Sequence, residues 1–256
     1  MPSVSQQVSL QAIPHVSIII ITYNSTKDIS ACLQSILDQQ SVAVELIIID
    51  NHSSDMTSKV ITDFFMQLPK PINSTNFPNT TMIQNQENLG FSKAVNQAAK
   101  LARGEFIYLF NPDAKFSTPT DMANLIAYAQ KNSKLGLVGS KVVGLDGVES
   151  KPQYSYPNER FVSFDSSELP GKLAWVIGAS MLILTKVFIE IGGLEEDSFL
   201  YIEDIDLCLR LRQKDLEIGY CPEVVVQHIG SASADQLPSY DKKVLKTKAR
   251  YLFCKK

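Results

Sequence analysis

The amino-acid sequence predicts a single α/β domain in which helices flank a mainly parallel central sheet. Three observations lead to this fold class. The chain up to Ser150 alternates short β-rich runs with stretches of helical periodicity. Apolar residues make up 45% and charged residues 20% of the sequence, which is ordinary for a globular protein. A chain of 256 residues can bury a substantial core and has a common length for one such domain.

Four apolar, β-rich runs in the first part of the chain predict strands, and they are Val16–Ile21, Val44–Asp50, Thr81–Gln84 and Glu105–Phe110. Apolar residues recur at helical spacing over Ile29–Leu37, and Ser25 or Thr26 stands where a residue that caps this helix is expected. A second helical pattern over Phe91–Ala102 precedes the fourth strand. Each of these helices has one narrow apolar face, which suits packing on a sheet.

Two polar stretches, Asn73–Thr80 and Lys151–Pro170, predict surface loops. The second is long for a connection without structure, and loops of this length tend to be lids or binding segments. The later elements are, in chain order, a strand within Trp175–Leu184, a short helix, a helix that begins near Glu203 after Phe199–Tyr201, and a strand Ile218–Gln227 that ends at His228.

The composition excludes several classes of protein. A formal net charge of −3 argues against nucleic acid as a partner, since binding to a phosphate backbone usually needs a positive surface. The four cysteines lack the paired spacing of a zinc site or a redox motif, so we expect reduced thiols and a cytoplasmic protein. The early apolar run Val16–Ile21 is far shorter than the roughly 20 residues of a membrane span, so it predicts a strand and not an anchor or a signal peptide.

Polar side chains end three of the predicted strands. They are Thr22, Tyr23 and Asn24 after the first strand, Asp50 and Asn51 at the second, and Asn111, Pro112 and Asp113 after the fourth. Ligands of open α/β sheets bind beyond the carboxyl ends of the strands. Each group alone is equally well explained as a turn former or a helix cap, but three such groups together favour a binding site.

Asp113 is the candidate metal ligand, because Pro112 fixes the backbone where Asp113 presents a carboxylate at the rim of the sheet. A hard divalent cation prefers such oxygen ligands, and Mg²⁺ or Mn²⁺ commonly completes its shell with substrate phosphates. His228, at the end of a later strand, would supply a nitrogen ligand if the fold brings it to the same rim. The alternative is that His228 is a hydrogen-bonded structural residue.

Three acids open the helix that begins near Glu203, and favourable interaction with the helix dipole is one explanation for them. At about 100° per residue, Glu203 and Asp206 fall on the side of Arg210, and Asp206 and Arg210 form an i,i+4 pair. Asp204 falls on the apolar half of the helix. Burial would raise the pKa of this carboxyl group while the helix N-terminus lowers it, which suits a general base.

The chain resembles the inverting family 2 glycosyltransferases with the GT-A fold, especially the rhamnosyltransferase-like members that build bacterial surface polysaccharides. The matching segments run in order along the chain and are Val16–Asn24, Ile47–Asp55, Asn88–Asn96, Phe110–Asp113, Trp175–Ala179 and Tyr201–Arg210, followed by His228. The resemblance implies one Rossmann-like domain over residues 16–240, with a nucleotide-binding part at about 16–115 and an acceptor part at about 116–240. Residues 1–15 would be an N-terminal extension, and 241–256 a basic C-terminal helix.

On the donor side, the resemblance implies that Thr22, Tyr23 and Asn24 line the nucleotide pocket. It implies that Asp50 reads the base, with Asn51 and Asp55 nearby. The wall that faces the donor sugar and its diphosphate would be formed by Asn88, Gly90, Phe91 and Asn96. Asn111 takes the place of the first acid in the family's Asp-x-Asp motif and Asp113 that of its metal-binding acid, so we expect Mn²⁺ or Mg²⁺ as cofactor.

On the acceptor side, Asp204 matches the family's catalytic base, and Trp175, Gly178, Ala179 and Glu203 would border the acceptor. The implied reaction moves a sugar, with inversion, from a dTDP-linked or UDP-linked donor to a glycan or lipid-linked glycan. A rhamnose donor is favoured. Two alternatives stay open: a catalytically inactive sugar-nucleotide or glycan-binding module, and a sugar nucleotidyltransferase, although the glycine-rich phosphate loop of the latter is absent after the first strand.

The chain ends in its only charge block, the segment Asp241–Lys256, which has helical composition. It contains Lys242, Lys243, Lys246, Lys248, Arg250, Lys255 and Lys256, interleaved with apolar residues. Such a segment predicts reversible docking on an anionic membrane, here the inner face of the cell membrane. A solvated last helix explains the same pattern equally well.

Overall fold

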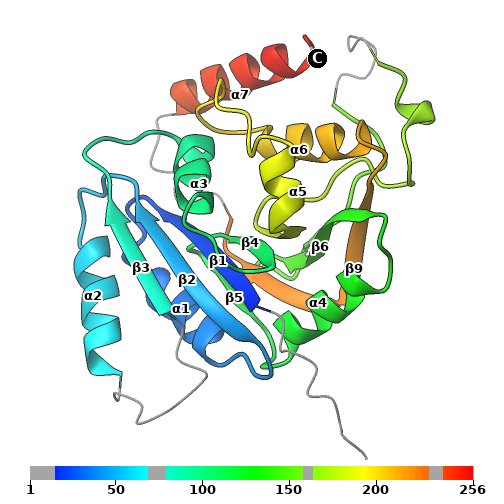
Figure 1. Cartoon of the computed structure of the whole chain (residues 1–256). Coiled ribbons are helices and arrows are strands. Elements are labelled where there is room, and N and C mark those ends of the chain that lie inside the picture. The colour runs from blue at the N-terminus through cyan, green and yellow to red at the C-terminus, as the bar shows by residue number, and fades with distance from the viewer. Residues whose placement is uncertain (1–14, 69–78, 158–163, 231–238, 256) are drawn as a thin grey trace, which may run out of the picture.

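The computed structural model describes residues 15–68, 79–157, 164–230 and 239–255. A nine-stranded sheet in the order β3-β2-β1-β4-β8-β6-β9-β5, with β7 beside β6, forms its centre (Figure 1). The strands are β1 (His15–Thr22), β2 (Ala43–Asp50), β3 (Asn79–Gln84), β4 (Phe106–Phe110), β5 (Ala114–Phe116), β6 (Leu135–Val143), β7 (Glu149–Ser150), β8 (Ser180–Leu184) and β9 (Glu217–His228). The helices are α1 (Ile29–Leu37), α2 (Thr57–Gln67), α3 (Phe91–Ala99), α4 (Asp121–Gln130), α5 (Thr185–Glu190), α6 (Glu203–Arg212) and α7 (Ser239–Phe253), with a short 3₁₀ turn at Ser166–Glu168.

The sheet is mainly parallel, as predicted. β1 pairs in parallel with β2 and β4, β2 with β3, and β6 with β9. The antiparallel strand β8 lies between β4 and β6, so these two also run in the same direction. Only β5, β7 and β8 run against the others among the described strands. One sheet therefore contains strands from residues 16–115 and from residues 116–240.

The strands alternate their side chains between two hydrophobic cores. Val16, Ile18 and Ile20 of β1 pack on one side with α1, α2 and α4. Ile19 and Ile21 point to the other side and pack with α3, α5 and α6. Because both faces are covered, β1 is apolar almost without interruption, as is typical of a central parallel strand.

Helix α1 begins at Ile29, as the periodicity predicts, but its predicted cap is wrong. Neither Ser25 nor Thr26 caps it, because the N-cap is Asp28, which makes no capping hydrogen bond with its side chain. Both predicted capping residues instead form hydrogen bonds near the start of α2. Ser25 N donates to Thr57 Oγ1 at 2.7 Å, and Thr26 Oγ1 donates to Asp55 Oδ2 at 2.6 Å. A turn in which Ser25 O accepts from Asp28 N and Ile29 N then leads into the helix.

The predicted loops are only partly described. Most of 73–80 lies outside the described residues, and Asn79 and Thr80 already belong to β3. In the predicted loop 151–170, Gln153 forms a β-bridge with Trp175, and the buried Arg212 donates to the carbonyl groups of Leu169, Pro170 and Gly171. The part of this loop at 158–163 is outside the described residues. The described parts are thus fastened to the domain.

The basic C-terminal segment forms a helix, as predicted, and α7 lies above α6 in Figure 1. Its inner face buries Phe253 in a third core with Tyr156, Ile205 and Leu209, and Ala249 is buried beside it. Two of these residues belong to α6, so α7 packs directly on the helix that carries Asp204. In the part of the chain that is described, no helix combines the length and the apolar character needed to cross a membrane.

Candidate active site

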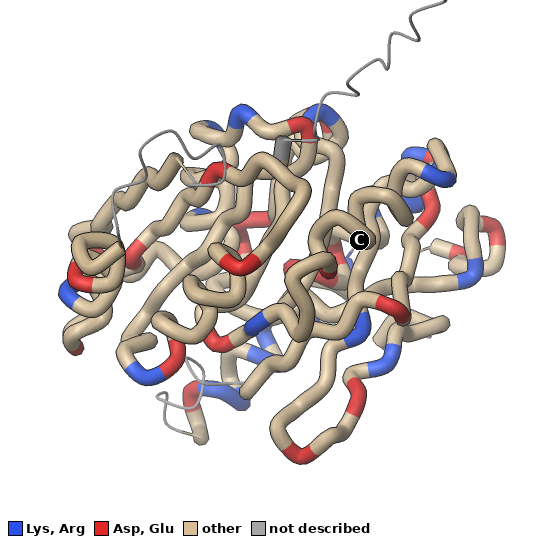
Figure 2. Tube along the Cα trace, turned by 90° about the horizontal axis from the view of Figure 1, so that it is seen from below, with Lys and Arg blue, Asp and Glu red and all other residues tan. Residues whose placement is uncertain are grey.

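A cleft of about 350 Å³ lies at the edge of the sheet where the parallel strands end. The predicted site residues that line it are Phe91, Asn111, Asp113, Trp175, Gly178, Ala179, Glu203, Asp204 and His228. Side chains from distant parts of the sequence thus meet in one place. The volume is within the range of small-molecule sites. Positions of Lys and Arg are interspersed with positions of Asp and Glu along the described chain (Figure 2).

The structure brings Asp113 and His228 together, as the sequence required for a metal site. Their strands pair: Ala114 of β5 lies opposite His228 of β9. His228 Nε2 lies 3.2 Å from Asp113 Oδ1 and 3.0 Å from Asn111 Nδ2, and Gly230 N donates to Asp113 Oδ2 at 3.1 Å. A carboxylate and an imidazole that converge in this way fit a divalent cation as two of its ligands.

Protein side chains alone do not complete a metal shell here. Among the described residues, no cluster of three or more His, Cys, Asp or Glu side chains is suited to hold an ion. A cation on Asp113 and His228 would therefore take its other ligands from water and from the donor diphosphate, which is usual for Mg²⁺. Asn111 contributes no negative charge, so we expect the cation to bind weakly until the donor is present.

Asp204 lies in the first turn of α6, half-buried, with its carboxylate in the cleft. Gly178 N donates to its Oδ2 at 3.1 Å and Ile205 N to its Oδ1 at 2.9 Å. Burial raises the pKa of Asp204 above its ordinary value, and these backbone hydrogen bonds offset only part of the effect. A carboxylate with a raised pKa is a stronger base, which suits proton abstraction from a hydroxyl group.

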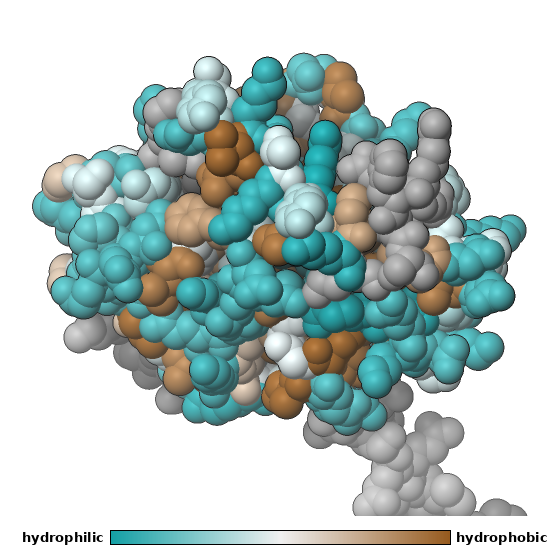
Figure 3. All heavy atoms as spheres, turned by 90° about the horizontal axis from the view of Figure 1, so that it is seen from above, coloured by the Kyte–Doolittle hydropathy of each residue, from teal (hydrophilic) through white to brown (hydrophobic). Residues whose placement is uncertain are grey.

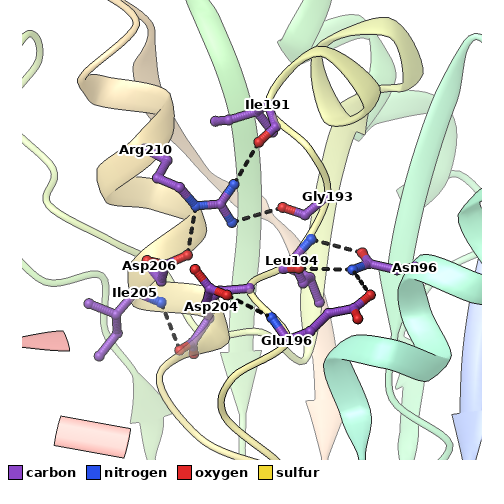
Figure 4. A network of polar contacts seen from close by, with 10 residues as sticks. Asn96, Ile191, Gly193, Leu194, Glu196, Asp204, Ile205, Asp206 and Arg210 are labelled. Carbon is purple, nitrogen blue, oxygen red and sulfur yellow. Dashed lines mark hydrogen bonds and ion pairs between the residues drawn. The ribbon is translucent and has the colours of Figure 1, made fainter. Parts of the chain in front are cut away.

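The predicted i,i+4 pair forms at the side of the helix, where Arg210 Nε donates to Asp206 Oδ2 at 2.7 Å. Arg210 also donates to the carbonyl oxygens of Ile191 at 2.9 Å and Gly193 at 2.8 Å (Figure 4). These bonds join α6 to the loop between α5 and α6. The sequence indicates the pair but not the link to the loop.

A strained turn sets the position of the first residues of α6. Tyr201 and Ile202 have φ angles of 75° and 74°, in the left-handed region. A β-branched residue rarely adopts this conformation, and each such residue costs about 1–3 kcal/mol. Ser198 Oγ contacts the carbonyl oxygens of Leu200 and Tyr201 at 3.1 and 3.2 Å and so ties the turn together. Nothing in the local sequence predicts this strain, since glycine or asparagine is the usual residue there.

Of the residues predicted to bind the nucleotide, Phe91 and Asn111 line the cleft, and most of the others lie around the ends of β1 and β2. Asp50 is fully buried beneath this surface, as is Thr22. The Asp50 carboxylate accepts hydrogen bonds from Ser53 Oγ at 2.5 Å, from Thr22 Oγ1 at 3.2 Å and from Ser58 Oγ. It therefore fixes the loop after β2, and its role in reading the base stays a prediction.

Asn24 and Asp55 organise the same loop. Asn24 has a φ of 48°, and its Oδ1 accepts from Ser54 N at 2.8 Å. Tyr23 lies half-buried beside it. Burial alone would raise the pKa of Asp55, but hydrogen bonds from Thr26 and Thr57 outweigh this and lower the pKa below its usual value. Asp55 is thus ionised and occupied by protein donors.

An amide chain ties β2 to the start of α3. Asn51 Nδ2 donates to Asn88 Oδ1 at 2.9 Å and to Gly90 O at 3.2 Å. Gly90 has a φ of 83°, and a Cβ atom there would lie 2.7 Å from Phe199 O. Phe91 N donates to this same carbonyl oxygen at 3.0 Å. The glycine is required because the loop before α6 passes directly over the start of α3.

Asn96 is not among the residues that line the cleft, and its place in the wall that faces the donor stays a prediction. Its Oδ1 accepts from Leu194 N, and its Nδ2 donates to Leu194 O and Glu196 Oε1, each at 2.8 Å (Figure 4). Five residues after Phe91, at about 100° per residue, the side chain leaves α3 on a different side. Asn96 therefore holds the loop that leads to α6.

Comparisons with known proteins show what the chain is similar to. A family model described as Glycosyl transferase family 2 matches residues 17–192. An N-acetylglucosaminyl-diphospho-decaprenol L-rhamnosyltransferase of Mycobacterium tuberculosis is 22% identical over 258 residues, which cover 87% of this chain and 78% of the relative. A low-salt glycan biosynthesis hexosyltransferase of Haloferax volcanii is 25% identical, with 86% and 68% covered. An uncharacterized protein of Sinorhizobium fredii is 28% identical over 88% of this chain, which spans only 25% of that relative's length.

Solved structures are similar in fold at low sequence identity. A mannosyltransferase from Pyrobaculum calidifontis in complex with GDP-Man and Mn²⁺ has a TM-score of 0.65 at 19% identity, covering 92% of this chain and 69% of its own. S. aureus TarS 1-349 in complex with UDP-GlcNAc has a TM-score of 0.62 at 18% identity, covering 91% and 66%. The predicted GT-A fold is confirmed.

Proposed function

Since the chain belongs to glycosyl transferase family 2, we propose that it moves one sugar from a nucleotide-diphosphate donor to a hydroxyl group of an acceptor, with inversion at the anomeric carbon. The observation that carries this proposal is the shared cleft, in which Asp204 and the pair Asp113 and His228 all lie. One group is a base for the acceptor, and the other two are ligands for the cation that accompanies a diphosphate.

In the proposed mechanism, Asp204 accepts the proton of the acceptor hydroxyl as its oxygen attacks the anomeric carbon. The bond between that carbon and the diphosphate oxygen breaks in the same step, and the nucleoside diphosphate leaves with the bonding electrons. Asp113 and His228 would hold a Mn²⁺ or Mg²⁺ ion, which supplies positive charge to the leaving diphosphate. Gly178 N and Ile205 N keep the Asp204 carboxylate aimed into the cleft.

For the donor we favour a dTDP-linked deoxyhexose, with rhamnose first and UDP-sugars next. The similarity to a relative named as an L-rhamnosyltransferase supports this choice. The cleft wall adds a physical argument, because Ile21, Pro112, Ile177 and Leu200 offer apolar contacts that suit the methyl group of a 6-deoxy sugar. We propose a glycan or lipid-linked glycan of bacterial surface polysaccharide biosynthesis as the acceptor.

A binding and turnover screen tests the proposed function. We expect dTDP and UDP to bind more tightly with Mn²⁺ than without it, measured by calorimetry, because a cation held by Asp113 and His228 would offset the negative charge of the diphosphate. We also expect release of nucleoside diphosphate from dTDP-rhamnose in the presence of an acceptor mixture. A protein that binds nucleotide but never releases diphosphate would be a binding module, and one that binds no nucleoside diphosphate would contradict the proposal altogether.

We further propose that α7 docks the protein on an anionic membrane. Its outer face exposes Tyr240, Val244 and Tyr251, beside Lys243, Lys248 and Lys255, while its inner face packs on α6. Lys255 Nζ lies 4.4 Å from the centre of the Tyr251 ring. Figure 3 shows the molecule from above, where hydrophobic side chains stand among hydrophilic ones. Tyrosine and lysine at one surface suit the interface of a bilayer.

Charge reversal on this outer face tests the docking. We expect the triple variant Lys243→Glu, Lys248→Glu, Lys255→Glu to lose binding to vesicles that contain phosphatidylserine at low salt, since each lysine contributes about 1 kcal/mol. These side chains lie away from the buried Ala249 and Phe253, so the fold should persist. Lys134→Glu, which changes an exposed lysine in the loop between α4 and β6, is the control. Unchanged sedimentation of the triple variant with the vesicles would refute the docking.

A further inference from the structure

Glu203 is a carboxyl group that lies between the active-site cleft and the underside of α7. It begins α6 and lines the cleft next to Asp204. It also borders a small recess that Ala249, Leu252 and Phe253 of α7 close from above. Its Oε2 atom is shielded from solvent and has no hydrogen-bond partner among the described residues. An ionised carboxylate in such a place loses its hydration without compensation, so the neutral acid is favoured.

The charges around Glu203 disfavour a further negative charge. Asp204 is its neighbour in the cleft, and Glu195 and Asp206 border the recess. Arg210 forms its ion pair with Asp206 and not with Glu203. From α7, Lys246 lies over the Tyr201 ring, with its Nζ 5.0 Å from the ring centre. Asp113 and His228 are the other charged or titratable side chains from distant elements that line the cleft.

The two neighbouring carboxyl groups differ in what stabilises their charge. Asp204 accepts two backbone N–H hydrogen bonds, which favour its ionised form. Backbone N–H groups of Glu203 and Tyr201 also favour the ionised form of Glu203, but its Oε2 atom has no partner among the described residues. Burial and the charge of Asp204 outweigh these hydrogen bonds and raise the pKa of Glu203 to about 8. A single negative charge on the pair therefore belongs on Asp204.

We propose that Glu203 keeps a proton in the working enzyme, leaves the single negative charge of the pair on Asp204, and by losing that proton sets the alkaline limit of sugar transfer. This role rests on the proposed function and deepens it. A doubly ionised pair would repel the diphosphate of the donor in the same cleft and would place an unpaired charge under α7. Glu203 is thus a positioning residue, which acts through the charge state of Asp204.

The first test is the pH dependence of transfer in Glu203→Gln, which is always neutral. In the unaltered protein the rate should fall about tenfold between pH 7 and pH 9, since one unit above its pKa only about one Glu203 in ten keeps the proton. In Glu203→Gln the rate should change less than about twofold over this range. Glu190→Gln, which removes an exposed carboxylate at the end of α5, should behave as the unaltered protein. An identical alkaline fall in Glu203→Gln overturns the proposal.

The second test needs neither substrate nor activity, so it separates a failure of this proposal from a failure of the proposed function. Because the pKa of Glu203 is raised in the folded state, its contribution to stability is complete below its ordinary value and is lost as pH rises towards 8. The melting temperature of the unaltered protein should therefore drop more steeply between pH 5 and pH 8 than that of Glu203→Gln. Parallel curves would contradict a buried proton.

Infrared spectroscopy tests the proposal on the unaltered protein, so its result does not depend on whether Glu203→Gln folds. A protonated carboxyl group has a carbonyl band that an ionised one lacks. We expect such a band at pH 7 and its loss above about pH 8, the pKa of Glu203. Absence of the band at pH 7 overturns the proposal regardless of how the variant behaves.

Discussion

Asp204→Asn should abolish sugar transfer while donor binding stays nearly unchanged. The amide keeps the size of the side chain and its place in the cleft, but it cannot accept the proton of the acceptor hydroxyl. Loss of a general base typically lowers the rate on the order of 100-fold or more. Turnover of donor and acceptor measures the loss, and calorimetry with the nucleoside diphosphate measures binding.

Asp206→Asn is the matched control, since Asp206 lies on the same helix turn but does not line the cleft. Its pairing with Arg210 would weaken, so we expect a lower melting temperature with most of the turnover retained. If Asp204→Asn keeps more than about a tenth of the turnover, another group is the base.

Asp113→Ala and His228→Ala should each raise the concentration of Mn²⁺ or Mg²⁺ that transfer requires by at least about tenfold, because each removes one of the two proposed protein ligands. Chelator treatment should stop transfer in the unaltered protein, and added cation should restore it. The dependence of rate on cation concentration, with donor held in excess, is the measurement.

Asp197→Ala serves as the control here, because it removes an exposed carboxylate from the loop before α6 and leaves the cleft as it is. Full transfer by chelator-treated protein would show that the pair Asp113 and His228 has another purpose. Their short contact would then be a structural ion pair or hydrogen bond between β5 and β9.

Regular local patterns in the sequence predict a large part of the fold. The central strands β1, β2 and β4 and the helices α1, α3 and α6 appear where the periodicity places them, apart from small shifts at their ends. The sequence analysis does not predict α2, α4, β5, β6 or β7. Segment β5 is only Ala114–Phe116, too short to carry a periodic signal, and its place in the sheet depends on pairing with β9.

The sequence by itself determined the fold class, the polar strand ends, the family resemblance, the amphipathic placement of Asp204 and the i,i+4 pair of Asp206 with Arg210. These depend on spacing within one element, which the backbone geometry of helices and strands converts directly into shared faces. A metal site requires that Asp113 and His228 lie close together. The sequence could not show that they do, because their distance depends on the order of strands in the sheet.

Only the tertiary structure decided which partners each polar side chain has. It placed Asn96 in hydrogen bonds with the loop before α6 and bonded Ser25 to Thr57 and Thr26 to Asp55. It left Glu203 Oε2 without a hydrogen-bond partner among the described residues. It also imposed the left-handed conformation of Tyr201 and Ile202. The physical reason is that hydrogen bonds and backbone strain are settled between segments distant in the sequence, where packing of the whole domain outweighs local preference.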